Sequence, residues 1–170
     1  MRHDQAAEDE IHESAVKSKY LIFTLCGELY GSALLQIKEV IKMTSIKPVP
    51  HAEKYFRGVI NLRGQIISVM DLRTKFQMVG HNPEQGLILI IEGDRGLVGA
   101  IVDTIEFVRE IPPESIQAGD AIETRIPRDQ FIGVARSSEQ LIHLIDLIKS
   151  VAVFQSSGTT SNLVNQKGAA

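Results

Sequence analysis

Short runs of apolar and β-branched residues, separated by turn residues, dominate the chain from residue 20 to residue 145. Such runs predict β-strands, here over residues 20–26, 29–34, 58–62, 65–70, 87–92, 96–102, 104–108, 131–136 and 140–145. Segment 36–41 instead has apolar residues at i, i+3 and i+4, which predicts a short helix or a turn. Strands this short and closely spaced favour small barrels or a sandwich.

Turn residues connect several of these strands. Arg63-Gly64 lies between two predicted strands and predicts a hairpin turn. The run 93–96 (GDRG) is likewise better explained by a hairpin than by a phosphate-binding loop. Asp71 directly follows a strand, where its carboxylate can accept hydrogen bonds from the first amides of a short helix.

The chain contains an internal repeat. Segment 56–72 aligns without a gap to segment 131–147, and segment 29–40 aligns in the same way to segment 97–108. The order of the two pairs is kept, so we interpret the chain as two similar small β units in tandem, about 18–80 and 86–154. Chance similarity between apolar strands is the alternative. The repeat leaves open whether strands exchange between the units, and it assigns no role to segment 109–130.

Residues shared by both copies are explained by folding alone. Gly58 corresponds to Gly133, and a glycine at both places can permit a backbone conformation or a close approach that a Cβ atom would block. Asp71 corresponds to Asp146, and both are interpreted as helix caps rather than as a catalytic pair.

Residues that differ between the copies are less constrained by folding and can instead contact a partner. Arg63 corresponds to Ser138, so the turn does not require an arginine, and Glu39 corresponds to Phe107. A guanidinium offers five donors suited to a carboxylate. A solvated surface charge is the simpler interpretation of each residue.

The charge is distributed unevenly along the 170 residues. Segment 1–17 holds five of the 21 acidic and two of the 18 basic residues, which leaves 16 of each sign elsewhere. We predict a disordered acidic tail over 1–17, a folded domain over 18–154 and a flexible tail over 155–170. A near-neutral body argues against nucleic acid as a partner. With no long apolar run for membrane insertion and no signal peptide, we expect a cytoplasmic protein.

The sequence shows no enzyme signature. The five histidines form no spaced set with Cys, Asp or Glu, and no phosphate-binding or nucleophile motif is present. One cysteine excludes an internal disulfide framework. We therefore expect no catalytic residues, no metal and no cofactor, and instead an interaction module. A nucleophile within hydrogen-bond reach of a base would revive the enzyme hypothesis.

A longer motif is now recognisable. The pattern G-V-x-N-L-R-G, followed by V-x-D-L-R, extends from Gly58 to Arg73, and GELYGSALLQIKEVI precedes it. With these motifs the chain resembles the CheW family of chemotaxis coupling proteins over about residues 19–153. Ser68 departs from the proline usual in the family, and Ala33 departs from the acidic residue that many members have.

The resemblance implies a mostly β, CheW-like fold of two SH3-like five-stranded barrels packed together, with short helices, and no enzymatic activity. It implies a non-catalytic adaptor in signal transduction that couples methyl-accepting chemoreceptors to the CheA histidine kinase. The cytoplasmic receptor tip would lie in a groove between the barrels. The regulatory domain of the kinase would dock at barrel ends, with possible ring assembly, and the protein would be recruited to membrane receptor arrays. The alternative is a paralogous chemosensory pathway, such as twitching motility or second-messenger control.

The resemblance also implies which residues of this sequence bind partners. Arg63 and Glu39, the two charges that folding leaves unexplained, are among them. The receptor- or kinase-binding residues that it implies are Ile37, Glu39, Gly58, Arg63, Leu89, Gly99, Ile105 and Val108.

Overall fold

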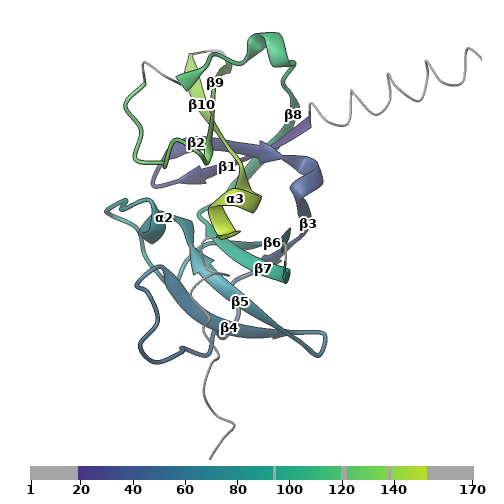
Figure 1. Cartoon of the computed structure of the whole chain (residues 1–170), viewed down its shortest axis with the longest axis vertical. Helices are drawn as coiled ribbons and strands as arrows, with labels where there is room; N and C mark the ends of the chain where they lie inside the picture. The colour runs from purple at the N-terminus through teal and green to yellow at the C-terminus, as the bar shows by residue number, and fades with distance from the viewer. Residues whose placement is uncertain (1–18, 94, 120–121, 138, 153–170) are drawn as a thin grey trace, which may run out of the picture.

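The computed structural model describes residues 19–93, 95–119, 122–137 and 139–152, so the expected tails lie outside the described residues. The described chain is mostly β (Figure 1). Its strands are β1 (Lys19–Leu25), β2 (Glu28–Ala33), β3 (Ile37–Lys42), β4 (Phe56–Leu62), β5 (Gln65–Asp71), β6 (Leu87–Gly93), β7 (Gly96–Val102), β8 (Ile105–Glu110), β9 (Phe131–Ser137) and β10 (Gln140–Ile145). Its helical segments are η1 (Leu34–Gln36), α2 (Leu72–Lys75), η2 (Pro113–Ser115) and α3 (Leu147–Ala152). None of these described helices is long and apolar enough to cross a membrane.

The strands form two five-stranded sheets, which Figure 1 shows one above the other. The sheet with the order β8-β1-β2-β10-β9 is called barrel I, and the sheet with the order β3-β6-β7-β5-β4 is called barrel II. Each sheet curls back on itself through an isolated bridge, Lys47 with Val59 in barrel II and Gln117 with Val134 in barrel I. The predicted fold class, two small barrels with short helices, is confirmed.

The two barrels take strands from both repeat copies. Barrel II uses the continuous stretch 37–102, whereas barrel I combines 19–33 with 105–145. The halves 18–80 and 86–154 therefore do not form separate sheets. Replacing each strand by its repeat equivalent converts one sheet order into the other, so the repeat is structural and includes strand exchange.

The registers of the two sheets repeat as well. In barrel I, His143 pairs with Tyr30 in a parallel arrangement. In barrel II, the equivalent residues Ser68 and Val98 pair in the same way.

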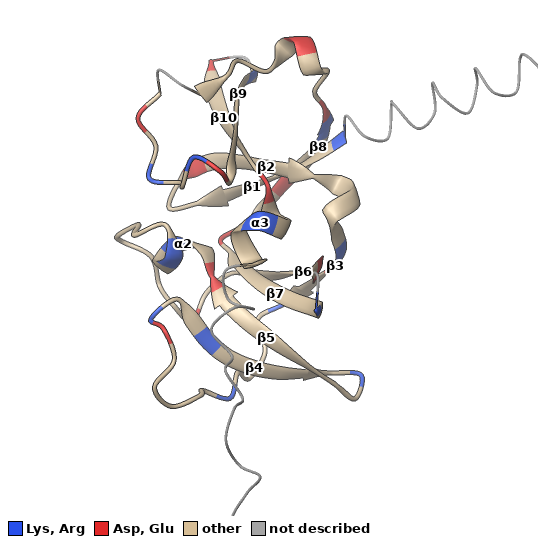
Figure 2. Cartoon of the chain, viewed as in Figure 1, with Lys and Arg blue, Asp and Glu red and all other residues tan. Residues whose placement is uncertain are grey.

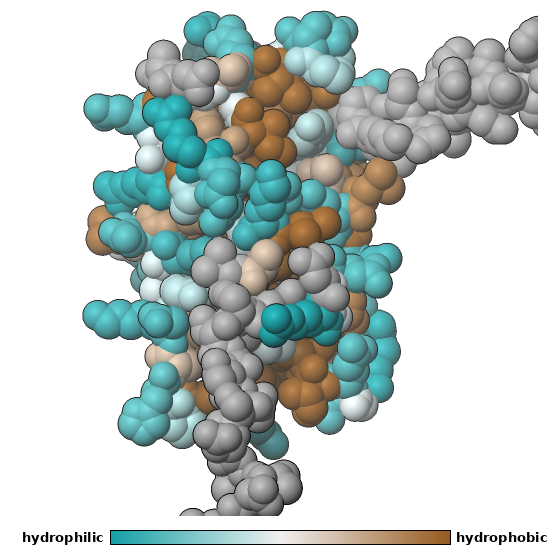
Figure 3. Space-filling view, in the orientation of Figure 1, coloured by the Kyte–Doolittle hydropathy of each residue, from teal (hydrophilic) through white to brown (hydrophobic). Residues whose placement is uncertain are grey.

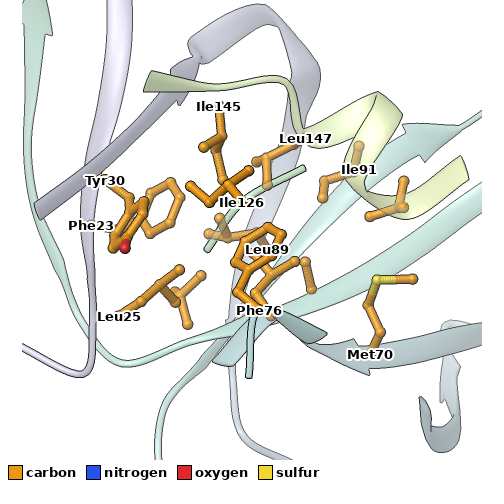
Figure 4. Close-up of a cluster of buried hydrophobic side chains, with 14 of the residues drawn as sticks. Phe23, Leu25, Tyr30, Met70, Phe76, Leu89, Ile91, Ile126, Ile145 and Leu147 are labelled. Atoms are coloured by element: carbon orange, nitrogen blue, oxygen red, sulfur yellow. The ribbon is translucent and has the colours of Figure 1, made fainter. Parts of the chain in front are cut away.

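The apolar side chains of the described residues form three clusters. One fills barrel I around Ile22 and Leu144, and another fills barrel II around Ile67 and Ile88. The largest cluster joins the barrels: Figure 4 shows Phe23 and Tyr30 of barrel I near Leu89 of barrel II. Each fully buried side chain of this size contributes about 1.5–3 kcal/mol. The barrels therefore share one core and are not independent units.

The prediction of a helix or turn over 36–41 is wrong. The 3-10 turn η1 ends at Gln36, and residues 37–42 form β3, which pairs antiparallel with β6. The spacing of Ile37, Val40 and Ile41 is helical, but these β-branched residues also suit a strand. Pairing with the apolar strand β6 decides the outcome.

The described residues of segment 109–130, which had no assigned role, contact both barrels. Ile111 packs in the core of barrel I, and Ile126 is buried in the cluster between the barrels. Arg125 Nη1 donates to the carbonyl of Gln77, which follows α2 in the sequence, at 3.0 Å. The segment thus helps to hold the barrels together.

The predicted helix caps are confirmed. Asp71 Oδ1 accepts from the backbone N–H of Arg73 at 3.0 Å at the start of α2. Its repeat equivalent Asp146 accepts from the N–H of Lys149 at 3.2 Å at the start of α3.

Candidate functional site

Two edge strands border the interface between the barrels. β3 is at the edge of barrel II and β8 is at the edge of barrel I. Ile37 on β3 and Ile105 on β8 are both partly buried and pack against the cluster between the barrels. These two predicted site residues are repeat equivalents. The structure therefore brings them to the same interface from opposite barrels.

Exposed apolar side chains continue along both edge strands. Val108 on β8 is 51% exposed, and its repeat equivalent Val40 on β3 is 41% exposed. Exposed apolar residues on a strand edge indicate a contact surface. We define the apolar edge as Leu35, Ile37 and Val40 on the β3 side and Ile105, Phe107 and Val108 on the β8 side.

Sequence reasoning missed part of this edge. The repeat equivalence of Val40 with the predicted site residue Val108 could have identified Val40. The exposure of Leu35 and Phe107, in contrast, depends on the packing of the barrels. Figure 3 shows apolar surface beside η1 and α3, bordered by hydrophilic side chains.

Arg63 and Glu39 form a two-pronged ion pair between the β4–β5 turn and β3. Arg63 Nη2 donates to Glu39 Oε1 at 2.7 Å, and Nη1 donates to Oε2 at 2.9 Å. The side chain of Arg63 is 74% exposed and that of Glu39 is 30% exposed. Figure 2 shows the basic tip of this hairpin, in a chain where acidic and basic residues are interspersed. The pair is open to a partner.

A cavity of about 360 Å³ lies beside this ion pair at one end of barrel II. Leu62, Ile90 and Leu97 supply its apolar lining. Lys38 and Glu92 form a second exposed ion pair at the same cavity. An apolar depression bounded by paired charges can accept an apolar side chain and orient it through the charges.

The backbone of Arg63 is left-handed, with φ of 52°, and Gly64 follows with φ of 88°. Two such residues form the tight hairpin turn that the Arg-Gly pair predicted, but Asn or Gly is preferred at the first position. A side chain there costs about 1–2 kcal/mol. The turn geometry disfavours arginine at this position. The contacts that its side chain can make therefore explain the presence of arginine better than the turn does.

Three of the eight predicted site residues are buried. Leu89 is 0% exposed on β6, where it pairs with Val40 of β3. A Cβ atom at Gly58, where φ is +136°, would lie 2.1 Å from the carbonyl oxygen of Lys47, and one at Gly99 would lie 2.8 Å from Ile88 Cγ2. These residues build barrel II, and their contact with a partner remains a prediction.

Sequence reasoning missed a buried network of charged side chains. Arg73 is 1% exposed and donates to Asp71 Oδ2 at 2.8 Å and to Asp103 Oδ1 at 2.6 Å. Burial lowers the pKa of Arg73, but hydrogen bonds and charges from the two carboxylates outweigh it, so the pKa rises above its usual value. Asp103 also accepts from the backbone N–H of Cys26. The network joins barrel II to the β1–β2 turn of barrel I.

The described residues offer no group of three side chains suited to a metal ion. They do bring Cys26 Sγ to 4.0 Å from His81 Nδ1, a contact that sequence reasoning did not find. Burial and the charge of Asp103 raise the pKa of the Cys26 thiol, which favours its protonated form. A nucleophilic cysteine needs the opposite shift.

Comparison with known proteins agrees with this fold. The family model of the CheW-like domain matches residues 19–153. The chemotaxis protein CheW of Treponema pallidum is 30% identical over 134 residues, which cover 75% of this chain and 78% of the relative. The chemotaxis protein CheW of Bacillus subtilis is 27% identical over 149 residues, which cover 87% and 94%.

The crystal structure of the scaffolding protein TtCheW from Thermoanaerobacter tengcongensis is also similar. It superposes with a TM-score of 0.70 and 32% identity, covering 77% of this chain and 85% of that protein. The matched residues include both barrels and the segments that carry the apolar edge and the ion pair. The chain therefore belongs to the CheW family of non-catalytic scaffold and adaptor proteins of chemotaxis.

Proposed function

We propose that this protein couples the cytoplasmic tips of methyl-accepting chemoreceptors to the regulatory domain of a CheA-type histidine kinase. The observation that carries the proposal is the apolar edge at the junction of the barrels, together with the accessible ion pair between Glu39 on β3 and Arg63 in the β4–β5 turn. Membership of the CheW family supports it, because coupling of receptors to CheA is the general role of that family.

The receptor tip is the partner that fits the apolar edge. A helical hairpin presents apolar side chains along one face, and a groove with two apolar margins can take such a face. Ile37 and Ile105 would form the margins, since each is partly buried in the shared core and partly accessible. Val108 would extend the contact outward.

The kinase regulatory domain is the partner proposed for the barrel ends. At barrel II, the cavity beside Glu39 and Arg63 combines an apolar lining with oriented charges. The kinase domain would dock there and alternate with this protein in a ring. The protein would act in the cytoplasm and be recruited to membrane receptor arrays.

Reconstitution tests the proposal directly. Receptor, kinase and this protein are combined, and kinase autophosphorylation is measured with and without attractant. We expect the protein to make autophosphorylation dependent on the receptor. If kinase activity and its response to attractant are the same with and without this protein, the proposal is wrong.

Charge reversal of the ion pair provides the first specific prediction. Glu39→Arg and Arg63→Glu should each reduce coupling strongly, because they place like charges together on the partner-facing surface. Their free energy of unfolding should change by no more than about 1 kcal/mol, as is usual for exposed ion pairs. The double reversal should restore the internal ion pair and its stability but not the coupling. Each of the two positions would then present the opposite charge to the partner.

Glu84→Arg is the matched control, since Glu84 is 78% exposed and pairs with Arg57 at 2.8 Å on another part of the surface. It should leave coupling unchanged. Recovery of full coupling in the double reversal would show that the pair acts only within the protein and that the partner does not contact it.

A further inference from the structure

The described chain passes between the two barrels at two places. It leaves barrel I between β2 and β3, through η1, and it returns from barrel II between β7 and β8, at Asp103 and Thr104. The two crossovers are repeat equivalents, with Gln36 at the position that corresponds to Thr104. Their side-chain contacts therefore restrain the position of one barrel against the other.

Buried charges hold the second crossover. Asp103 binds Arg73 Nη1 at 2.6 Å and the N–H of Cys26, and Arg73 binds the helix-capping Asp71. Removal of one partner from a buried pair leaves an unpaired charge, which is strongly destabilising. This crossover is firmly fixed.

Among the described residues, the neutral side chain of Gln36 makes the side-chain hydrogen bonds of the first crossover. Gln36 Oε1 accepts from Ser32 Oγ at 2.8 Å and from the N–H of Leu147 at 3.0 Å. Gln36 Nε2 donates to Asp146 Oδ1 at 3.1 Å, and Asp146 is the cap of α3 and the equivalent of Asp71. One amide thus ties together β2, the crossover and the start of α3.

Gln36 also lies next to the proposed binding site. It immediately precedes Ile37, the margin of the apolar edge on β3, and it lies three residues before Glu39. The helix α3 that it holds packs against β6, the strand with which β3 pairs. A shift of this amide therefore moves both the start of β3 and the helix that packs on its partner strand.

We infer that Gln36 is a positioning residue that sets the placement of the β3 edge against barrel I, through its hydrogen bonds to Asp146, Leu147 and Ser32. Its effect on partner binding rests on the proposed function, whereas its effect on the β3 edge does not. Gln36 carries no charge and only one of its partners, the Asp146 carboxylate, is charged, whereas both partners are charged in the buried Arg73–Asp71 pair. The contrast makes the first crossover the more adjustable one.

The Gln36→Glu variant tests this inference. The new carboxylate keeps two acceptor contacts but meets Asp146 as a like charge instead of donating to it. Asp146→Asn added to this variant restores a donor opposite the new carboxylate, and asparagine remains a good helix cap. Gln36→Met removes the hydrogen bonds without adding charge. Gln140→Glu is the matched control, because it makes the same change at an exposed position of β10.

Hydrogen exchange of the partner-free protein is the first measurement. In Gln36→Glu and in Gln36→Met, amides at 37–42 and in the first turn of α3 should exchange about tenfold faster, while amides of β9 should not change. Gln36→Glu with Asp146→Asn should return exchange to the original rate. Unchanged exchange in the single variants, or no recovery in the double variant, would overturn the inference.

Binding of a receptor cytoplasmic hairpin is the second measurement. Gln36→Glu should weaken binding about tenfold, and the double variant should restore it, in parallel with exchange. Altered exchange with unaltered binding would overturn the link between Gln36 and the partner site. If the unmodified protein binds neither the hairpin nor the kinase regulatory domain, the proposed function fails, and the exchange result still decides the role of Gln36.

Discussion

At the scale of single residues, Arg73 and His143 show that polar groups near the interface between the barrels have contrasting partners. Arg73 is surrounded by acceptors, whereas His143 Nδ1 is buried with no hydrogen-bond partner among the described residues. His143 stacks on Tyr30 with ring centroids 5.2 Å apart and lies 6.2 Å from the ring of Phe131. Its role is that of an aromatic packing group, and a charge on it would be poorly accommodated.

The pH dependence of stability should reflect His143. Burial lowers the pKa of His143 below its ordinary value, although the carboxylate of Glu28 acts in the opposite direction. As the pH falls below about 6.5, the unfolded chain takes up the proton before the folded chain does, so the free energy of unfolding decreases. His143→Phe keeps the stacking and removes this contribution. Denaturant unfolding between about pH 7 and pH 5 should therefore show a smaller pH dependence in this variant.

His51→Asn is the control for that experiment, because His51 is exposed and has a left-handed φ of 60° that asparagine tolerates. It should keep the original pH dependence. An equal slope in His143→Phe and the unmodified protein would show that other groups cause the loss of stability in acid.

At the scale of elements, closure of each barrel depends on one glycine. Val59 and Lys47 exchange two backbone hydrogen bonds of 2.9 Å, and Gly58 lies directly beside this bridge. Gly133 has the same place beside the bridge of barrel I, with φ of +154°. In both barrels, the segment that follows an edge strand approaches the backbone of the glycine so closely that no side chain fits at that position.

Gly58→Ala should open this closure. The added methyl group would meet the Lys47 carbonyl oxygen at 2.1 Å, in addition to the cost of the left-handed backbone. Gly64→Ala is the matched control, because φ there is +88° but nothing lies within 4 Å of the added atom. Chemical unfolding should show a loss of about 1 kcal/mol for Gly64→Ala and clearly more for Gly58→Ala. Equal losses would mean that the close approach is relieved without cost.

Local patterns predicted most strands and the turn at Arg63-Gly64, since both depend on residues that are neighbours in the sequence. The same reasoning failed for β3, where a helical spacing and a strand composition coincide and pairing with β6 decides. The Arg63–Glu39 pair joins residues 24 apart, and the Gln36–Asp146 contact joins residues 110 apart. The first contact depends on how barrel II closes and the second on how the crossover meets α3, and no local pattern contains either arrangement. The repeat identified candidate positions, but not their partners.

At the scale of the whole molecule, the shared core and the exchanged strands make the barrels mutually dependent. The cluster between them contains residues of both sheets, of α2 and of α3. Parallel pairing of β5 with β7 in barrel II and of β2 with β10 in barrel I joins the two repeat halves. A cut between the halves therefore divides both barrels.

Fragments 1–80 and 86–170 should each fail to fold alone and should fold when mixed. Each fragment lacks strands of both sheets, so neither can bury the cluster between the barrels. Dispersed amide signals in NMR spectra should be absent from either fragment and should appear on mixing. A fragment 1–102, which contains every strand of barrel II, is the comparison and should retain part of the structure. Native-like spectra from either half alone would contradict the shared-core interpretation.

The order of the strands also has a consequence for synthesis on the ribosome. Barrel II is continuous in the sequence, so all of its strands have been made once residue 102 has been added. The hairpin of β1 and β2 is made first, yet its neighbours β8 and β10 are made last. During translation, both edges of this hairpin stay unpaired and its apolar face stays uncovered while the middle of the chain assembles. The first strands to leave the ribosome are thus among the last to be enclosed, and the nascent chain is most exposed to aggregation in that interval.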